Sequence, residues 1–364
     1  MIKIKQVFVA IITLLIVFSS FTHISKAYAY SKEEAEEAIT ETHQIIIDCY
    51  KAALEAEKAG ANITELTKIL NEVGDSFSRA LLALKNGDYD LALQLTNKCN
   101  TKLGGFIDKA EIMRNKASEE QYWSLIFIIC TGISAVLIIC IGFAVWTLLK
   151  RRYSNGKMKV NPKDYQILFL TVIFVSALIL ASPALSRILV YPRTEFFTEL
   201  WILDSNHKAE NYPFNISQNQ NYSIYLGIAN RLGHCAYYMV QVKFRNETQP
   251  APTSFGPIEE RLPSSLPALY NFTFFIADEQ VEEHPLTFSI NYVSNEELTK
   301  VNIQSMKLNN ATISLPNYVI GWNSTRKGFY GFLFFELWLY DKNIESFKYH
   351  GRFVGLWLNM TLSV

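Results

Sequence analysis

Three long apolar runs divide the chain. The first, Val7 to Phe21, follows Lys3 and Lys5 and is closed by the small residues of an Ala-Tyr-Ala sequence at 27–29. A short basic region, an apolar core and a site of small residues are the three parts of a secretory signal peptide. We therefore interpret residues 1–29 as a cleaved signal peptide, with an uncleaved membrane anchor as the alternative.

The other two runs predict a pair of transmembrane helices. Residues 122–149 hold no charged side chain, and neither do Gln166 to Ser186 within a second run at 165–189. At about 1.5 Å of rise per residue, each run can cross a hydrocarbon layer of roughly 30 Å. A chain in lipid must satisfy its own backbone hydrogen bonds, so both should be helical. Pro183 predicts a kink or a helix end.

The segment between the runs, residues 150–164, predicts the orientation. Short loops rich in lysine and arginine remain cytoplasmic. The residues that we expect to set the topology are Lys150, Arg151, Arg152, Lys157, Lys159 and Lys163. Both larger segments, 30–121 and 190–364, should then be extracytoplasmic parts of a multi-pass protein of the cell membrane.

Residues 30–121 predict a helical bundle. Ser31 and Glu34 form a capping-box sequence, and apolar residues follow at helical spacing. Gly60 and Asn86-Gly87 divide the segment into three helices with short connections, which favours an antiparallel bundle. Gly104-Gly105 predicts a bend in the third helix, whose last turns can continue directly into the first membrane span.

Residues 190–364 predict an antiparallel sheet domain. Short aromatic and β-branched runs alternate with turn signals, a pattern typical of a β-sandwich. The predicted strands are Phe197–Leu203, Tyr222–Ala229, Ala236–Phe244, Tyr270–Ala277, Leu286–Val293, Val301–Lys307, Tyr330–Tyr340 and Phe353–Leu362. No pair of cysteines spans two sheets, so the architecture should be Ig-like without being a true immunoglobulin domain. Gln249 to Pro267 holds five of the eleven prolines, which predicts a long surface loop that forms part of a contact surface. The fold class is therefore an α+β membrane protein: helical bundle, transmembrane hairpin and sandwich.

Glycosylation signals agree with this orientation. All eight Asn-x-Ser/Thr sequences lie in the two segments placed outside, which predicts N-glycosylation there. The candidate acceptors are Asn62, Asn215, Asn221, Asn246, Asn271, Asn310, Asn323 and Asn359.

The five cysteines offer one possible disulfide. Cys49 and Cys99 fall on the apolar stripes of the first and third helices, where an oxidising exterior could bridge them. The alternative is two buried free thiols that act as small apolar residues. Cys130 and Cys140 lie in the first span, and Cys235 should be buried or pair with another chain.

Composition adds little chemistry. The chain has 34 basic and 34 acidic residues, so no general positive charge points to nucleic acid. Metalloprotease, nucleophile-elbow, phosphate-loop and dinucleotide motifs are all absent, and we predict no catalytic, cofactor-binding or metal-ligating residue. One dense polar cluster is better interpreted as a solvated turn between strands than as a site for a hard cation. It consists of Asp278, Glu279, Glu282, Glu283 and His284.

The sheet segment resembles a known family. The stretches Phe197–Leu203, Ala209–Pro213, Gly227–Asn230, Gly328–Tyr340 and Leu356–Leu358 are similar to the ectodomain of an archaeal membrane-protein family called "domain of unknown function sixteen-sixteen". The resemblance covers roughly residues 160–364 and implies a cell-surface β-domain with no known reaction. That family usually has several spans before the ectodomain, whereas one immediately precedes it here.

These observations favour a non-enzymatic cell-surface protein that binds or organises envelope components. Its expected partners are the lipid bilayer and a protein or glycan at the outer surface, without nucleic acid or cofactor. The sequence leaves the oligomeric state open. One alternative is an accessory subunit of a membrane export or glycan-assembly complex. Another is an extracytoplasmic hydrolase, which a cleft with converging carboxylates or a Ser/His pair would support.

Overall fold

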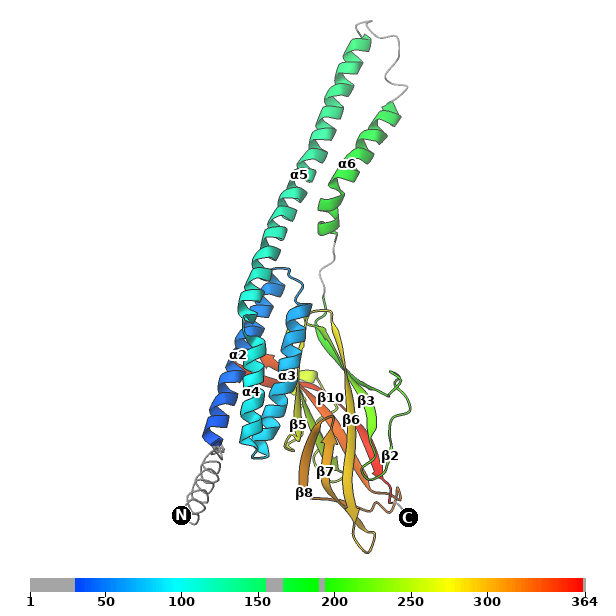
Figure 1. The fold of residues 1–364 in the computed structure, drawn as a ribbon. Coiled ribbons are helices and arrows are strands. Elements are labelled where there is room, and N and C mark those ends of the chain that lie inside the picture. Colours follow the sequence, from blue (N-terminus) through cyan, green and yellow to red (C-terminus); the bar gives the residue numbers. More distant parts are fainter. Residues whose placement is uncertain (1–29, 155–165, 190–193, 363–364) are drawn as a thin grey trace, which may run out of the picture.

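The structure, a computed structural model, describes residues 30–154, 166–189 and 194–362. A group of helices packs beside a sheet domain, and two helices project together from that body (Figure 1). The helices are α2 (Lys32–Lys58), α3 (Thr64–Lys85), α4 (Tyr89–Leu103), α5 (Phe106–Ser154) and α6 (Gln166–Ile188). The signal-peptide interpretation of residues 1–29 lies outside the described residues.

The predicted helical part is confirmed, including its start. The Ser31 hydroxyl oxygen accepts a hydrogen bond from the Glu34 amide, and the Glu34 carboxylate accepts one from the Ser31 amide, which completes the capping box. The third predicted helix is divided in two at Gly104-Gly105. Gly105 has φ +73°, a conformation that favours glycine, so α4 ends there and α5 begins.

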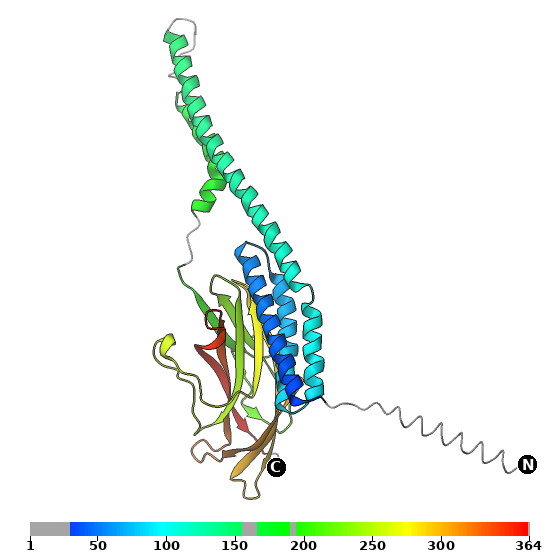
Figure 2. The ribbon, with the colours of Figure 1, turned by 90° about the vertical axis from the view of Figure 1, so that its left-hand side faces the viewer.

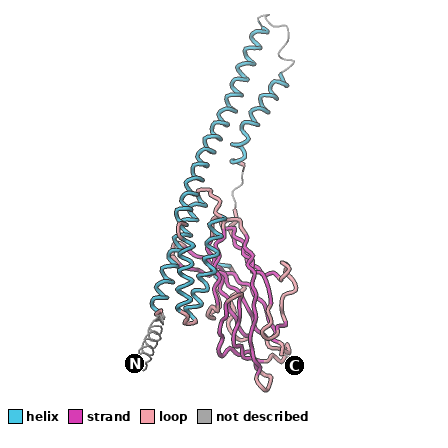
Figure 3. Tube along the Cα trace, viewed as in Figure 1, coloured by secondary structure: helices cyan, strands magenta, loops and turns pink. Residues whose placement is uncertain are grey.

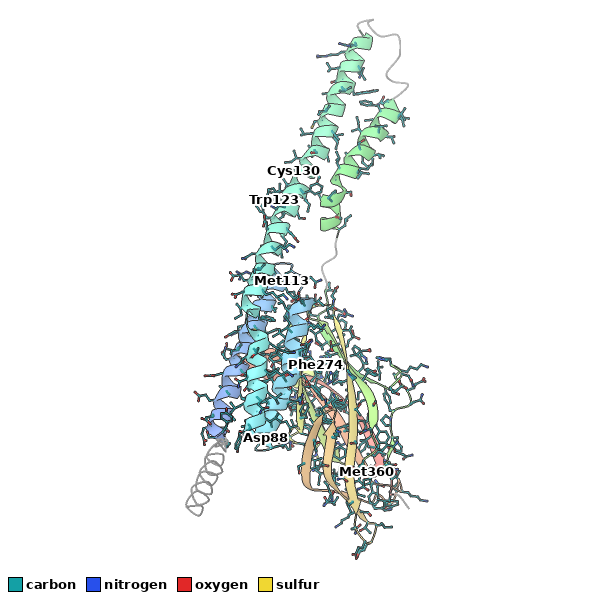
Figure 4. All side chains as sticks on the ribbon, viewed as in Figure 1. Asp88, Met113, Trp123, Cys130, Phe274 and Met360 are labelled. Carbon is teal, nitrogen blue, oxygen red and sulfur yellow. The ribbon has the colours of Figure 1, made fainter. Side chains whose placement is uncertain are left out.

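Helix α5 runs without interruption for 49 residues, from the bundle through the apolar run of residues 122–149. It also includes the start of the segment predicted as a loop, since Lys150, Arg151 and Arg152 are helical. Pro183 lies inside α6, which continues to Ile188. Helices α5 and α6 are both long and apolar enough to cross a membrane. Figure 4 labels Trp123 and Cys130 on the projecting part of α5 and Met113 beside the bundle.

The C-terminal part contains two five-stranded sheets (Figure 3). The first has the order β1-β3-β6-β7-β8 and the second the order β2-β10-β9-β4-β5. The strands of the first sheet are β1 (Phe197–Leu203), β3 (Tyr222–Arg231), β6 (Val281–Ser294), β7 (Lys300–Leu308) and β8 (Ala311–Gly321). Those of the second are β2 (Asn215–Ile216), β4 (Ala236–Asn246), β5 (Tyr270–Ile276), β9 (Tyr330–Asp341) and β10 (Ser346–Met360).

Strand pairing is antiparallel with one exception, because β2 and β10 pair in parallel. Two strands, β2 and β8, are absent from the sequence prediction. A third difference concerns the polar cluster: Asp278 and Glu279 lie in a turn, but β6 starts at Val281 and includes Glu282, Glu283 and His284. The prediction of a turn is therefore wrong for the second half of this cluster.

Two hydrophobic clusters hold the body together. One draws residues from both sheets, among them Phe288 and Phe335. The other joins the helices to the opposite face of the second sheet, where Tyr237 and Phe275 pack against residues such as Tyr50. Helices α2 and α3 thus cover part of the outer face of that sheet (Figure 2). Bundle and sheets form one packed body.

Candidate functional site

Polar contacts join the bundle to the end of the sheets from which the helical pair projects (Figure 1). The Asn71 side chain of α3 donates to the Phe275 carbonyl (3.1 Å) and accepts from the Phe275 amide (2.6 Å), so it pairs with β5 as another strand would. The Glu57 carboxylate of α2 accepts hydrogen bonds from the backbone amides of Cys235 and Asp278. The Tyr50 hydroxyl donates to the Cys235 carbonyl (3.0 Å). These bonds place the C-terminal half of α2 on the strand ends.

The proline-rich loop covers another part of the same outer face. Lys243 of β4 and Glu336 of β9 form an ion pair of 2.7 Å with side chains 4% and 0% exposed. Ser264 of the loop satisfies both: its carbonyl accepts from Lys243 (2.8 Å) and its amide donates to Glu336 (2.6 Å). Burying two charges is tolerated only when partners compensate them. The predicted loop therefore contacts its own sheet.

A pocket of about 690 Å³ lies between α2 and this loop. Its walls also include the turn between β3 and β4 and the hairpin of β9 and β10. The lining residues are Tyr50, Leu54, Lys58, Gly233, His234, Ile258, Glu259, Leu339, Tyr340, Asp341, Lys342, Asn343, Lys348, Tyr349 and His350. We call it the hairpin pocket. Its volume is within the usual range for small-ligand sites.

Two phenols of the hairpin pocket lack hydrogen-bond partners. Tyr340 is 5% exposed, and its hydroxyl is buried with no partner among the described residues. The Tyr349 hydroxyl is in the same condition. Burial raises the pKa of both, with the charges of Glu345 and Glu336 respectively adding to it, so both remain O–H donors. An unmade hydrogen bond at a buried polar group costs roughly 1–3 kcal/mol, which is unusual in a folded protein.

Three lysines line the same pocket as these phenols. Lys58, Lys342 and Lys348 are exposed and come from α2, the hairpin turn and β10. Lys58 pairs with Glu55 at 2.9 Å, and the charge of Lys342 also lowers the pKa of Glu55, which places the two lysines near one carboxylate. Of the two acidic lining residues, Asp341 already accepts a hydrogen bond from the Asn343 amide (2.8 Å).

A histidine and a threonine meet beside the pocket. His350 Nε2 lies 2.9 Å from Thr198 Oγ1, which lies 2.8 Å from the Tyr238 hydroxyl. Tyr238 donates to Asn230 Oδ1 (3.2 Å), whose own amide group donates to two carbonyls. Tyr238 must therefore accept from Thr198, and Thr198 must accept from His350.

This proton order decides what the group can do. The Thr198 hydroxyl points away from His350, and Nε2 carries the proton, so His350 is not placed to deprotonate Thr198. Burial, with the Arg352 charge adding to it, lowers the pKa of His350 to about 4. The hydrogen bonds instead join β1 of the first sheet to β4 and β10 of the second. The Ser/His arrangement that would support a hydrolase is not what this group provides.

The cysteines are free in the structure. Cys49, Cys99 and Cys235 are buried, and Cys99 Sγ lies 3.6 Å from the Val73 carbonyl. Burial raises the pKa of Cys49 to about 12 and that of Cys99 to about 11, so both thiols stay protonated. Both thiols are free in the structure, and a disulfide between them stays a prediction.

The eight glycosylation signals differ in accessibility. Those that are exposed are Asn62, Asn215, Asn221 and Asn310, whereas Asn246, Asn271, Asn323 and Asn359 are half-buried. Glycan transfer occurs at the side-chain nitrogen, and that atom already donates to Val319 in Asn246, to Glu247 in Asn323 and to Asn215 in Asn359. The exposed four are therefore the better acceptors. Asn310 also lines a separate cavity of about 510 Å³ between α3 and the sheets.

The remaining predicted groups lie apart from the hairpin pocket. In the polar cluster, Glu283 pairs with His207 at 2.8 Å, and burial raises the pKa of Glu282. Within the described residues, no group of three or more His, Cys, Asp or Glu side chains is arranged to hold a metal ion. Of the basic topology residues, Lys150, Arg151 and Arg152 are exposed at the end of α5. Lys157, Lys159 and Lys163 lie outside the described residues.

The residues that carry the family resemblance have structural roles here. A Cβ at Gly227 would lie 2.0 Å from Trp201, so the tryptophan requires glycine on the neighbouring strand. Tyr212 donates to the Ile202 carbonyl (2.7 Å). Asn230 organises the hydrogen bonds around Tyr238. Trp201, Tyr212 and Asn230 do not line the hairpin pocket, whereas Leu339 and Tyr340, at the end of the stretch Gly328–Tyr340, do.

Sequence reasoning did not find the pocket. Its walls come from positions as distant as Tyr50 and His350, and none of them forms a local motif. The one signal was the proline-rich loop, whose residues Ile258 and Glu259 make one wall.

Comparisons with known proteins add no family. No family model matches the chain, and no curated protein matches it. Among solved structures, β-glucosidase from Listeria innocua in complex with glucose matches 48% of this chain with 8% identity and a TM-score of 0.25. The match spans only 17% of the length of that enzyme. The PapD-like domain 7 of human CEP192 matches 47% of this chain and 91% of its own, with 9% identity and a TM-score of 0.19.

Proposed function

We propose that this chain is a non-enzymatic binding protein of the cell surface, held in the membrane by α5 and α6. The bundle and the two sheets, stacked as a sandwich, form one extracytoplasmic body. The hairpin pocket is its binding site. The likeness to the archaeal membrane family belongs to the same proposal.

One observation carries the proposal: both folded parts lie at the same end of the helical pair. Helix α5 leaves the bundle and enters the apolar run without a break, and α6 returns toward β1. The two parts share a hydrophobic cluster, so they must occupy the same side of a membrane. Side chains along both helices are mostly exposed, for example Phe143 at 70% and Ile179 at 67%. Such apolar surface is stable in lipid, whereas its exposure to water is unfavourable in free energy.

Thiol labelling of sealed cells tests the orientation. Glu41→Cys on α2 and Lys327→Cys between β8 and β9 replace exposed residues of the two folded parts. We expect a membrane-impermeant maleimide to label both in intact cells. Lys157→Cys, in the basic segment, should be labelled only after permeabilisation.

The unsubstituted chain is the control, because Cys49, Cys99 and Cys235 are buried and Cys130 and Cys140 lie in the apolar run. Labelling of Lys157→Cys in sealed cells would contradict the orientation. Labelling of only one of the two folded parts would contradict the shared side.

A further inference from the structure

We propose that the hairpin pocket binds a phosphorylated polyol, such as the head group of an anionic phospholipid. This proposal rests on the proposed function for the position of the bilayer. The binding itself is measured on purified protein and does not depend on orientation.

The buried end of the pocket contains hydrogen-bond donors, so a ligand that fits there should carry acceptors. The hydroxyls of Tyr340 and Tyr349 are donors without partners among the described residues. The Tyr340 ring is fixed by Tyr50, Tyr237 and Phe347, with ring centroids 6.1, 5.6 and 5.5 Å away. The packing therefore holds the Tyr340 hydroxyl in place, without a hydrogen-bond partner among the described residues. Ligand oxygens would complete its hydrogen bonding.

The rim of the pocket carries more basic than acidic side chains, which favours a ligand with negative charge. Lys58, Lys342 and Lys348 converge from three elements, against the two acidic lining residues Glu259 and Asp341. Lysine ammonium groups bind phosphate as point charges, whereas planar carboxylates are matched best by arginine, and no arginine lines this pocket. The combination of donors below and ammonium groups above suits a phosphate carried on a hydroxylated group.

The position of the pocket indicates that the ligand comes from the membrane. Lys58 is two residues from Gly60, where a Cβ would lie 2.5 Å from the Gln121 side chain. Gln121 directly precedes the uncharged run of α5. On the opposite wall, Gly233 lies against Phe196, close to the end of α6 in sequence. The pocket is therefore at the end of the body that faces the proposed bilayer, at the level of lipid head groups.

Purified full-length protein in neutral detergent tests this with two probes. Glycerol 3-phosphate represents a soluble source, and a short-chain phosphatidylglycerol represents a lipid source. Glycerol and short-chain phosphatidylcholine are the matched neutral and zwitterionic controls. We expect a saturable rise in melting temperature with the phosphorylated polyols and none with the controls. Binding of both probes assigns the shared chemistry, and binding of phosphatidylglycerol alone assigns the lipid.

Tyr340→Phe removes one hydroxyl and keeps the ring. Because that hydroxyl has no partner in the part of the chain that the structure describes, the unliganded melting temperature should stay the same or rise. The affinity should fall about two- to tenfold, the usual loss for one hydrogen bond to a neutral hydroxyl. Lys342→Gln with Lys348→Gln should weaken binding and reduce its salt dependence, whereas Lys327→Gln, at a distant exposed lysine, should do neither.

Three results would overturn the proposal: no binding of either phosphorylated probe, equal binding of glycerol, or unchanged affinity in Tyr340→Phe. None of them bears on the thiol labelling, so failure of this inference leaves the proposed orientation intact. Conversely, labelling from the wrong side would place the pocket at the inner leaflet, and the soluble probe would still report on the pocket.

Discussion

At the scale of single residues, the His350 group links folding to pH. The folded protein keeps this imidazole neutral, with a pKa of about 4, whereas the unfolded chain should titrate at the usual value near 6.5. Between these values the unfolded state binds more protons, so stability is greatest above pH 6.5 and declines as the pH falls toward 4. The full effect is about 3 kcal/mol.

Denaturant unfolding between pH 7 and pH 4 measures this decline. His350→Asn should be less stable at pH 7, because Thr198 loses its donor, and its stability should depend less on pH. Burial also lowers the pKa of His43 and His284, so some dependence will remain in the variant. A slope identical to that of the unsubstituted protein would show that His350 is not protonated on unfolding in this range.

At the scale of elements, the two projecting helices pack through small residues. A Cβ at Gly142 of α5 would lie 2.4 Å from Ile173 Cδ1 of α6, so glycine here leaves the space that the Ile173 side chain fills. Gly142→Leu should separate them by about 1–2 Å at a cost of about 1–3 kcal/mol. Gly132→Leu is the control, since a Cβ there meets nothing within 4 Å.

Spin labels report the separation. Leu148 and Ile167 are exposed near the stacked pair of Trp146 and Phe169, and each can carry a label in a chain in which Cys130 and Cys140 are replaced by alanine. The distance between the labels should increase in Gly142→Leu and stay constant in Gly132→Leu. An increase in both variants would mean that bulk alone, without the close approach, separates the helices.

Element prediction succeeded where one chemical pattern extends over a whole element. The bounds of β1 are those predicted, Phe197–Leu203, because its aromatic and β-branched residues end at a polar turn. Strand β8 was missed because Pro316 interrupts its pattern, and its position at a sheet edge is what tolerates proline. Strand β2 is only two residues long, and Glu282 and Glu283 concealed the start of β6. A strand with one polar face looks like a turn when its apolar positions are few.

The candidate site was beyond local patterns for a different reason. The hairpin pocket depends on how α2 and the proline-rich loop share one face of a sheet, and that arrangement follows from packing. The sequence shows that Tyr340 belongs to a strand, but only the packed body shows that its hydroxyl lacks a partner.

At the scale of the whole molecule, the start of α2 lies far from the apolar part of α5. The Tyr30 amide donates to Asp90 at the beginning of α4, and Asp88 of the same turn is labelled at the remote end of the bundle in Figure 4. The 27 residues of α2 span about 40 Å from there to Lys58. Eight residues separate Phe21 from Tyr30, and even fully extended they reach only about 30 Å.

In the proposed placement, an uncleaved anchor at residues 7–21 therefore could not enter the same bilayer as α5 and α6. We expect the mature protein to begin close to Tyr30, as N-terminal sequencing or intact mass of the purified protein will show. Recovery of the chain with Met1 still attached would contradict both the cleavage and the placement of the bundle relative to the membrane.

The unbroken α5 has a mechanical consequence. In the proposed placement the body is tied to the lipid twice, by a stiff rod on the bundle side and by the strand that follows α6 on the other. A domain attached to the membrane at one point can rotate about that point, whereas a domain attached at two separate points keeps a fixed tilt and height above the bilayer. A partner that binds the body from outside must approach a surface of fixed orientation. A lateral force on the body is transmitted to α5 and α6.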